Sequence, residues 1–90
     1  MASRDDVNRL RVTIAGTEYT LRGDASVEQM RTVANKVDEL MTEIAQANPQ
    51  LDEKRAAVLT AVNIADELYR LQIQYDSLLQ LLDEQTDSNK

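Results

Sequence analysis

The 90-residue sequence contains no cysteine, histidine, phenylalanine or tryptophan. The absence of Cys excludes a disulfide, and the absence of both Cys and His argues against a zinc or other transition-metal site. Its aromatic residues are three tyrosines, Tyr19, Tyr69 and Tyr75, so the large side chains that usually fill a core are scarce. We therefore expect a thin monomeric core and stability gained by oligomerisation.

Long apolar segments and catalytic motifs are also missing. No apolar run approaches the roughly 18 residues of a membrane span, and the N-terminus lacks the apolar stretch of a signal peptide, which predicts a cytoplasmic protein with no membrane partner. Gly16 and Gly23 belong to no phosphate-binding motif. Adjacent acidic residues occur at Asp38 and Glu39, at Asp66 and Glu67, and at Asp83 and Glu84. Neighbours on a helix point in different directions and no nucleophile accompanies these pairs, so we expect no catalytic residue, cofactor or metal.

The net charge of −6 is unevenly distributed. Residues 1–36 contain six basic and five acidic residues, whereas residues 37–90 contain four basic and eleven acidic residues. Because nucleic-acid binding depends on clustered Lys and Arg, this balance argues against a nucleic-acid partner.

A β-hairpin is predicted near the N-terminus. Apolar residues alternate with polar ones at Leu10, Val12 and Ile14, and again at Tyr19 and Leu21. Between them, Gly16 is expected to supply the positive φ of a type I turn with a G1 bulge. Two strands alone are only marginally stable, so their apolar face must pack on a helix or on another chain.

Two helices are expected after the hairpin. The first follows the N-cap Ser26, with apolar residues in helical spacing from Val27 to Ile44, and ends at Asn48-Pro49. The second follows the N-cap Asp52 and meets no helix-breaking residue before Thr86. Its roughly 33 residues, 53–85, would span ~50 Å, which is more than the hairpin and first helix could cover.

The second helix carries two interleaved heptad seams, which indicate assembly. The first seam comprises Val58, Ala61, Ala65, Leu68, Gln72, Tyr75, Leu79 and Leu82, and the second comprises Ala57, Ala61, Ile64, Leu68, Leu71, Tyr75, Leu78 and Leu82. A single seam is covered by one partner helix, whereas two seams offset by one residue need cover from two sides. The predicted oligomerisation residues are Ala61, Ala65, Leu68, Leu71, Gln72, Tyr75, Leu78, Leu79 and Leu82.

Two polar residues on this helix have alternative interpretations. Gln72 lies at an a position, where a polar side chain can fix register and oligomeric state, or it lies at the edge of the interface in water. Asn63 lies off the shared row of the seams. Its side chain can form a hydrogen bond to the backbone within the head, which is a structural role, or it can have a functional role.

Basic residues of the N-terminal part are candidates for contact with an acidic partner. Lys54 and Arg55 begin the second helix, where the macrodipole disfavours cations by roughly 0.3 to 1 kcal/mol each. The candidate set is Arg22, Arg31, Lys36, Lys54 and Arg55. The alternative is that Asp52 and Glu53 offset the charges of Lys54 and Arg55 locally. Lys54 and Arg55 would then be solvated surface residues without a role in binding.

The order of these features resembles the ZapA family of bacterial cell-division proteins. The resemblance rests on RVTIAGTEYTLRG (residues 11–23), NPQLD (48–52) and AVLTAVNIADELYRL (57–71), and it covers the chain from Arg11 to about Leu82. It implies a dimeric head and a helical tail through which two dimers form a tetramer. It also implies that the tetramer binds and cross-links filaments of FtsZ at the division site.

The sequence therefore predicts an α+β adaptor without enzymatic activity, similar to the short form of this family. The expected division is a flexible tail at 1–9, a head at 10–68, a projecting coiled-coil segment at 69–85 and a flexible tail at 86–90. The alternatives are a holdase-like coiled-coil chaperone, a generic oligomeric scaffold, and an enzyme. A holdase would leave its apolar surface open for unfolded client proteins. Here the apolar seams keep heptad register as far as Leu82, which favours pairing with a specific partner helix.

Overall fold

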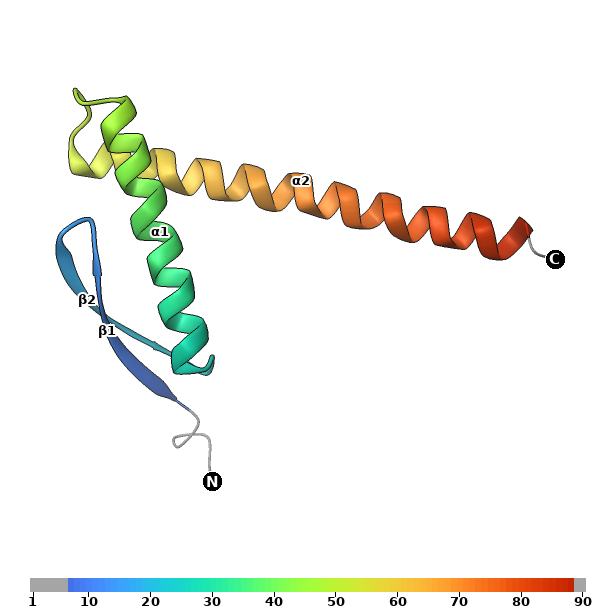
Figure 1. Ribbon diagram of the computed structural model, residues 1–90, viewed down its shortest axis with the longest axis horizontal. Helices are drawn as coiled ribbons and strands as arrows, with labels where there is room; N and C mark the ends of the chain where they lie inside the picture. The colour runs from blue at the N-terminus through green and yellow to red at the C-terminus, as the bar shows by residue number, and fades with distance from the viewer. Residues whose placement is uncertain (1–6, 89–90) are drawn as a thin grey trace. The chain divides into compact units, whose positions relative to one another are not determined.

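The computed structural model describes residues 7–88, with side chains as far as residue 84. Strands β1 (Asn8–Ile14) and β2 (Thr17–Gly23) form an antiparallel hairpin that precedes two helices, α1 (Val27–Ala47) and α2 (Glu53–Ser88) (Figure 1). This α+β order is the one predicted. The chain divides into two compact units, one ending at Thr60 and the other beginning at Ala61. The predicted head boundary after Leu68 lies further along α2 and stays a prediction.

The hairpin turn consists of two residues, and its predicted type was wrong. Ile14 pairs with Thr17, which leaves only Ala15 and Gly16 between the strands. Both residues have positive φ, 52° and 80°. This is the arrangement of a type I′ turn, whose twist matches that of the flanking strands, so no G1 bulge is needed. The positive φ of Gly16 is confirmed, while that of Ala15 carries the steric cost of a side chain in the left-handed region.

Two hydrogen bonds attach the hairpin to the segment that contains α1. The Ala15 backbone N–H donates to Oδ1 of Asp38 at 2.8 Å, which holds the turn against the middle of α1. At the other end of the hairpin, Nδ2 of Asn8 donates to the carbonyl oxygen of Ala25 at 2.8 Å. β1 begins at Asn8, which pairs with Gly23, two residues before the predicted Leu10.

Removal of the Asp38 carboxylate tests the attachment of the turn. We expect Asp38→Ala to lower the free energy of unfolding by up to about 1 kcal/mol, because the Ala15 N–H loses its side-chain acceptor. Urea unfolding of parent and variant at one chain concentration measures the effect. Glu39→Ala is the matched control, since it removes an exposed carboxylate on the next residue. Equal losses in the two variants would show that the Asp38 bond contributes nothing specific.

Helix α1 packs against β1 through one apolar face. Val12 of β1 is buried, as are four residues of α1 at helical spacing, namely Met30, Ala34, Met41 and Ile44. The helix begins as predicted, because Oγ of Ser26 accepts a hydrogen bond from the Gln29 backbone N–H at 3.0 Å. It ends at Ala47, where Nδ2 of Asn48 donates to the carbonyl oxygen of Ile44. Ser26 and Asn48 thus fix the two ends that the sequence predicted.

Helix α2 begins at its predicted cap and extends past its predicted end. Oδ1 of Asp52 accepts a hydrogen bond from the Arg55 backbone N–H at 2.8 Å. The helix continues to Ser88, although Thr86 was expected to end it. The predicted flexible tails therefore overlap the described elements at residues 8–9 and 86–88, while residues 1–6 and 89–90 lie outside the described range. No helix within residues 7–88 is long and apolar enough to cross a membrane.

Candidate functional site

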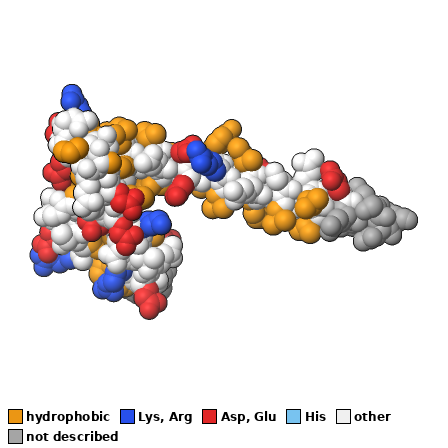
Figure 2. Space-filling model, turned by 45° about the horizontal axis from the view of Figure 1, so that its top comes forward, with side chains coloured by type: hydrophobic (Ala, Val, Ile, Leu, Met, Phe, Trp, Pro, Cys, Tyr) orange, Lys and Arg blue, Asp and Glu red, His pale blue; other side chains and the backbone are white. Residues whose placement is uncertain are grey.

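The part of α2 that follows Thr60 exposes every described side chain. From Ala61 to Glu84 all residues are exposed in the isolated chain, including the large apolar ones. Leu68, Leu71 and Tyr75 retain 63%, 62% and 61% of their accessible surface. Figure 2 shows apolar side chains along this helix on the face in view. Because contiguous apolar surface of this kind marks interaction sites on soluble proteins, this segment is the candidate functional site.

An unbroken helix brings the predicted seam residues to one side of α2. Steps of three and four residues keep side chains within a narrow range of angles, since successive residues rotate by about 100°. The shared row Ala61, Leu68, Tyr75 and Leu82 forms the centre, and the other residues of the two seams flank it. Gln72 is exposed and lies among them, so its role in register stays a prediction.

The polar side of α2 carries an intrahelical ion pair. Nε of Arg70 lies 3.0 Å from Oδ2 of Asp66, one turn earlier, and both side chains are exposed. Asn63 is exposed on the same side, and none of the described hydrogen bonds gives it the backbone partner suggested from the sequence. Exposed pairs of this type contribute little to stability. Their position indicates a face that remains in water.

The first turns of α2 are anchored differently from the rest. Ala56 and Thr60 are buried, with 4% and 2% of their surface accessible. The Thr60 hydroxyl donates to the carbonyl oxygen of Ala56 at 2.8 Å, which satisfies the only buried polar side chain of the described residues. This local bond lets a small polar residue occupy an apolar contact. From Ala61 to Glu84, by contrast, every side chain is exposed.

The five predicted partner-binding cations lie on three elements, and all are exposed. Arg22 is on β2, Arg31 and Lys36 are on α1, and Lys54 and Arg55 are in the first turn of α2. The salt bridges within residues 7–84 involve Arg11 with Glu18 and Arg70 with Asp66, so none of the five is paired in that range. No ion pair among the described residues joins the five into one cluster.

Strand register reveals one basic residue that the sequence analysis missed. Arg9 of β1 stands directly opposite Arg22 of β2. Both are exposed, on the face of the hairpin opposite to that of Leu10 and Val12. Like charges directly opposite across two strands are destabilising, so stability does not account for this pair. Counting back along each strand from the two-residue turn would have found it.

Comparisons with known proteins give one consistent result. Residues 10–89 match the family model described as cell division protein ZapA. The chain is similar to the cell division protein ZapA of Geobacillus sp. (strain WCH70), with 44% identity over 79 residues, 88% of this chain and 91% of that protein. With that of Geobacillus kaustophilus (strain HTA426) the identity is 42% over 82 residues, 91% of this chain and 90% of that protein.

A solved structure supports the same assignment. A ZapA mutant dimer from Geobacillus stearothermophilus shares 41% identity with this chain and superposes with a TM-score of 0.69 over 84% of this chain and 88% of that one. Its fold agrees with the hairpin followed by two helices described above. The family model matches most of the sequence, and the relatives are similar along nearly their whole length. The chain belongs to the ZapA family of cell division proteins.

Proposed function

We propose that this chain is a non-enzymatic adaptor that binds FtsZ filaments in the cytoplasm at the division site and cross-links them. The observation that carries the proposal is the complete exposure of α2 from Ala61 to Glu84, on a helix whose apolar residues keep heptad spacing. A helix of this pattern is stable in water only when other helices cover it. Assembly is therefore its first function.

Two seams support assembly in two steps. The proximal part of the two seams, from Ala61 to Leu71, pairs with a second copy to give a dimer. The distal part, with Tyr75, Leu78, Leu79 and Leu82, then receives helices of another dimer and gives a tetramer. The dimeric structure of the Geobacillus stearothermophilus relative supports the first step.

Cross-linking follows because the head binds a filament while α2 joins one dimer to another. Each dimer provides one head, so a tetramer joined through its helices provides two. When one head holds a filament, the second head meets a neighbouring filament at high effective concentration, so weak single contacts suffice. No catalytic group enters this mechanism. Within the described residues no cluster of His, Cys, Asp or Glu could hold a metal ion.

Local positive charge is the proposed means of filament recognition. The chain has a net charge of −6, and FtsZ filaments are expected from the family to be acidic, so the overall interaction is repulsive. Attraction must come from unpaired cations of the head. Arg22, with Arg9 opposite, and Lys54 with Arg55 all stand where they oppose local stability, which supports a role in binding. Arg31 and Lys36 complete the proposed set.

Charge reversal at these sites is expected to change stability and binding in opposite directions. Arg22→Glu creates an attractive pair with Arg9, and Lys54→Glu with Arg55→Glu suits the helix dipole, so neither protein should unfold more easily. Both should bind filaments several-fold more weakly, because the attractive charges are lost. Urea unfolding and high-speed co-sedimentation with FtsZ filaments measure the two properties.

Binding and cross-linking are tested together by sedimentation at two speeds. High speed pellets single filaments with any bound protein, whereas low speed pellets only bundles. The proposal predicts that the parent protein appears in both pellets and that the Glu variants leave the low-speed pellet. Unchanged binding of both variants at low salt, where surface charges are least screened, would remove these cations from the interface.

A further inference from the structure

One position of the heptad on α2 changes from apolar to acidic along the helix. With Val58 at position a, the e positions that follow are occupied by Val62, Tyr69, Asp76 and Asp83. We call these four residues the e column. All four are exposed in the isolated chain. The two seams keep their spacing to Leu82, so the change concerns the e column and not the seams.

The e column stands at the edge of the apolar face of α2. Successive residues of a helix rotate by about 100°, so the e position lies about 100° from the d row, while the a and g positions lie within about 60° of it. An apolar e position therefore creates a third seam, in which a and e residues alternate at steps of four and three. Ala65 and Tyr69 begin such a seam, and Asp76 and Asp83 interrupt it.

No cation offsets the two carboxylates of the e column. Neighbours on a helix surface are three or four residues apart, and none of the residues at these distances from Asp76 or Asp83 is Lys or Arg. Residues 71–88 contain no basic residue at all, so the same segment of another copy brings none either. Arg70, the last basic residue before this segment, is paired with Asp66. Burial of Asp76 or Asp83 between distal segments would therefore leave its charge uncompensated, which is strongly unfavourable.

We propose that Asp76 and Asp83 limit the assembly of α2 helices to the tetramer, by keeping the e side of the distal helix in water. The helices of the tetramer cover the a, d and g positions. A further helix that packed on the e side would bury both carboxylates, so it is excluded. The inference rests on the proposed tetramer and adds what restricts its size.

The position of the change agrees with this role. The e column is apolar as far as Tyr69, within the part of α2 that is proposed to form the dimer, and acidic from Asp76, within the part that is proposed to receive a second dimer. A helix with a wider apolar face takes more neighbours, because more of its circumference needs cover. With a third seam in the distal part, each tetramer would still expose apolar surface and could add further helices. The carboxylates leave it only the two seams that the tetramer uses.

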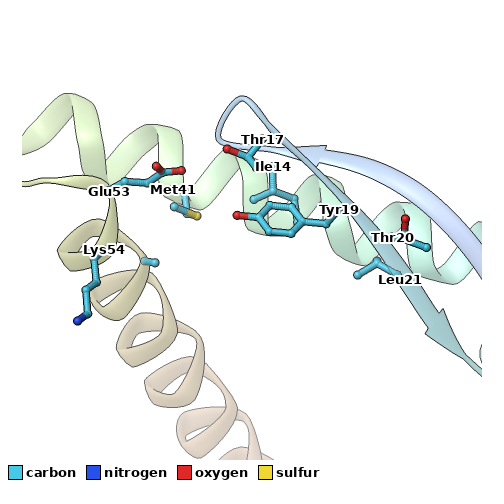
Figure 3. A pocket seen from close by; sticks show the side chains of 9 residues that line it. Ile14, Thr17, Tyr19, Thr20, Leu21, Met41, Glu53 and Lys54 are labelled. Carbon is cyan, nitrogen blue, oxygen red and sulfur yellow. The ribbon is translucent and has the colours of Figure 1, made fainter.

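The head has an apolar surface of its own, formed by other residues. A groove of about 720 Å³ beside β2 is lined by apolar side chains that include Ile14, Tyr19 and Leu21, and no residue beyond Ala57 lines it (Figure 3). Substitutions in the distal part of α2 leave all these residues in place. A change of assembly size that such substitutions cause is therefore a property of the helix and not of the groove.

Replacement of both carboxylates by leucine tests the proposal. The variant Asp76→Leu with Asp83→Leu completes the third seam. Two matched controls separate its effects. Asn63→Leu with Ser77→Leu adds two leucines at f positions, on the polar side of the helix, and Asp76→Asn with Asp83→Asn removes the same two charges without adding apolar surface. Leu has a higher helix propensity than Asp, so α2 should persist, which circular dichroism checks.

Sedimentation velocity at micromolar concentration gives the result. We expect the Asp-to-Leu pair to exceed the parent tetramer in mass by about 1.5-fold or more, which corresponds to two added helices, while both controls remain tetramers. A tetrameric Asp-to-Leu pair would overturn the inference and leave the proposed tetramer intact. An Asn pair that grows as much as the Leu pair would also overturn it, because general repulsion would then limit the assembly. A parent that sediments only as a dimer would remove the tetramer and the inference with it.

The unsubstituted chain provides a second measurement. Its carboxylates are coupled to glycine amide with a water-soluble carbodiimide, to less than one modification per chain, at concentrations that give dimer or tetramer. Mass spectrometry of the peptides gives the rate at each residue. Because the e side stays in water, the rates at Asp76 and Asp83 should change by less than about twofold when the tetramer forms. A loss of reactivity at both residues in the tetramer would show that the e side is covered and would overturn the inference.

Discussion

Leu79→Asp is expected to convert tetramers into dimers with an intact head. Leu79 is exposed in the isolated chain and lies on the first seam near its distal end. Burial of a carboxylate in an apolar seam costs several kcal/mol per site, and a tenfold change in affinity corresponds to about 1.4 kcal/mol. With a copy of the substitution in each chain, tetramer affinity should fall by more than about 1,000-fold. The dimer survives because the head and the proximal part of α2 are unchanged.

Sedimentation velocity at micromolar concentration measures this change. Ser77→Asp is the control, since it adds the same charge on the same helix at an f position outside both seams. The control should remain tetrameric. A Leu79→Asp protein that is still a tetramer would show that the distal seam is not the contact between dimers.

Removal of the distal part of α2 is expected to separate filament binding from bundling. A chain that ends at Tyr69 keeps the hairpin, α1 and the first turns of α2, including all five candidate cations. It loses Leu71, Tyr75, Leu78, Leu79 and Leu82 from the seams. It should therefore pellet with single filaments at high speed and fail to form bundles that pellet at low speed. If the truncated protein still bundles filaments under the electron microscope while sedimenting as a dimer, bridging through the helices is the wrong mechanism.

Local chemistry made most of the fold predictable. Ser26 and Asp52 cap the two helices because their side-chain oxygens accept backbone N–H groups, which is a property of a few consecutive residues. Asn48 and Pro49 end α1 for equally local reasons. The turn type was missed because Ala15, which has a side chain, adopts a positive φ, and the Asp38 carboxylate that accepts its N–H is 23 residues away in the sequence. That contact has no local sequence pattern.

The sequence predicted which apolar residues share one face of α2, but it was less informative about the basic residues. Heptad spacing directly predicts which residues share the seam face, and the exposure of Leu68, Leu71 and Tyr75 in the isolated chain agrees with a need for partners. Arg9 was missed because its significance depends on strand register, which places it opposite Arg22. Which cations touch a filament stays a prediction.

The measurement that tests the central claim most directly is sedimentation of the full-length parent chain over a wide concentration range, combined with low-speed pelleting of filaments in the same samples. If two dimers joined through α2 cross-link filaments, dimers convert to tetramers as concentration rises, and bundles appear over the range in which tetramers form. A chain that remains dimeric at every concentration while it bundles filaments would contradict the account.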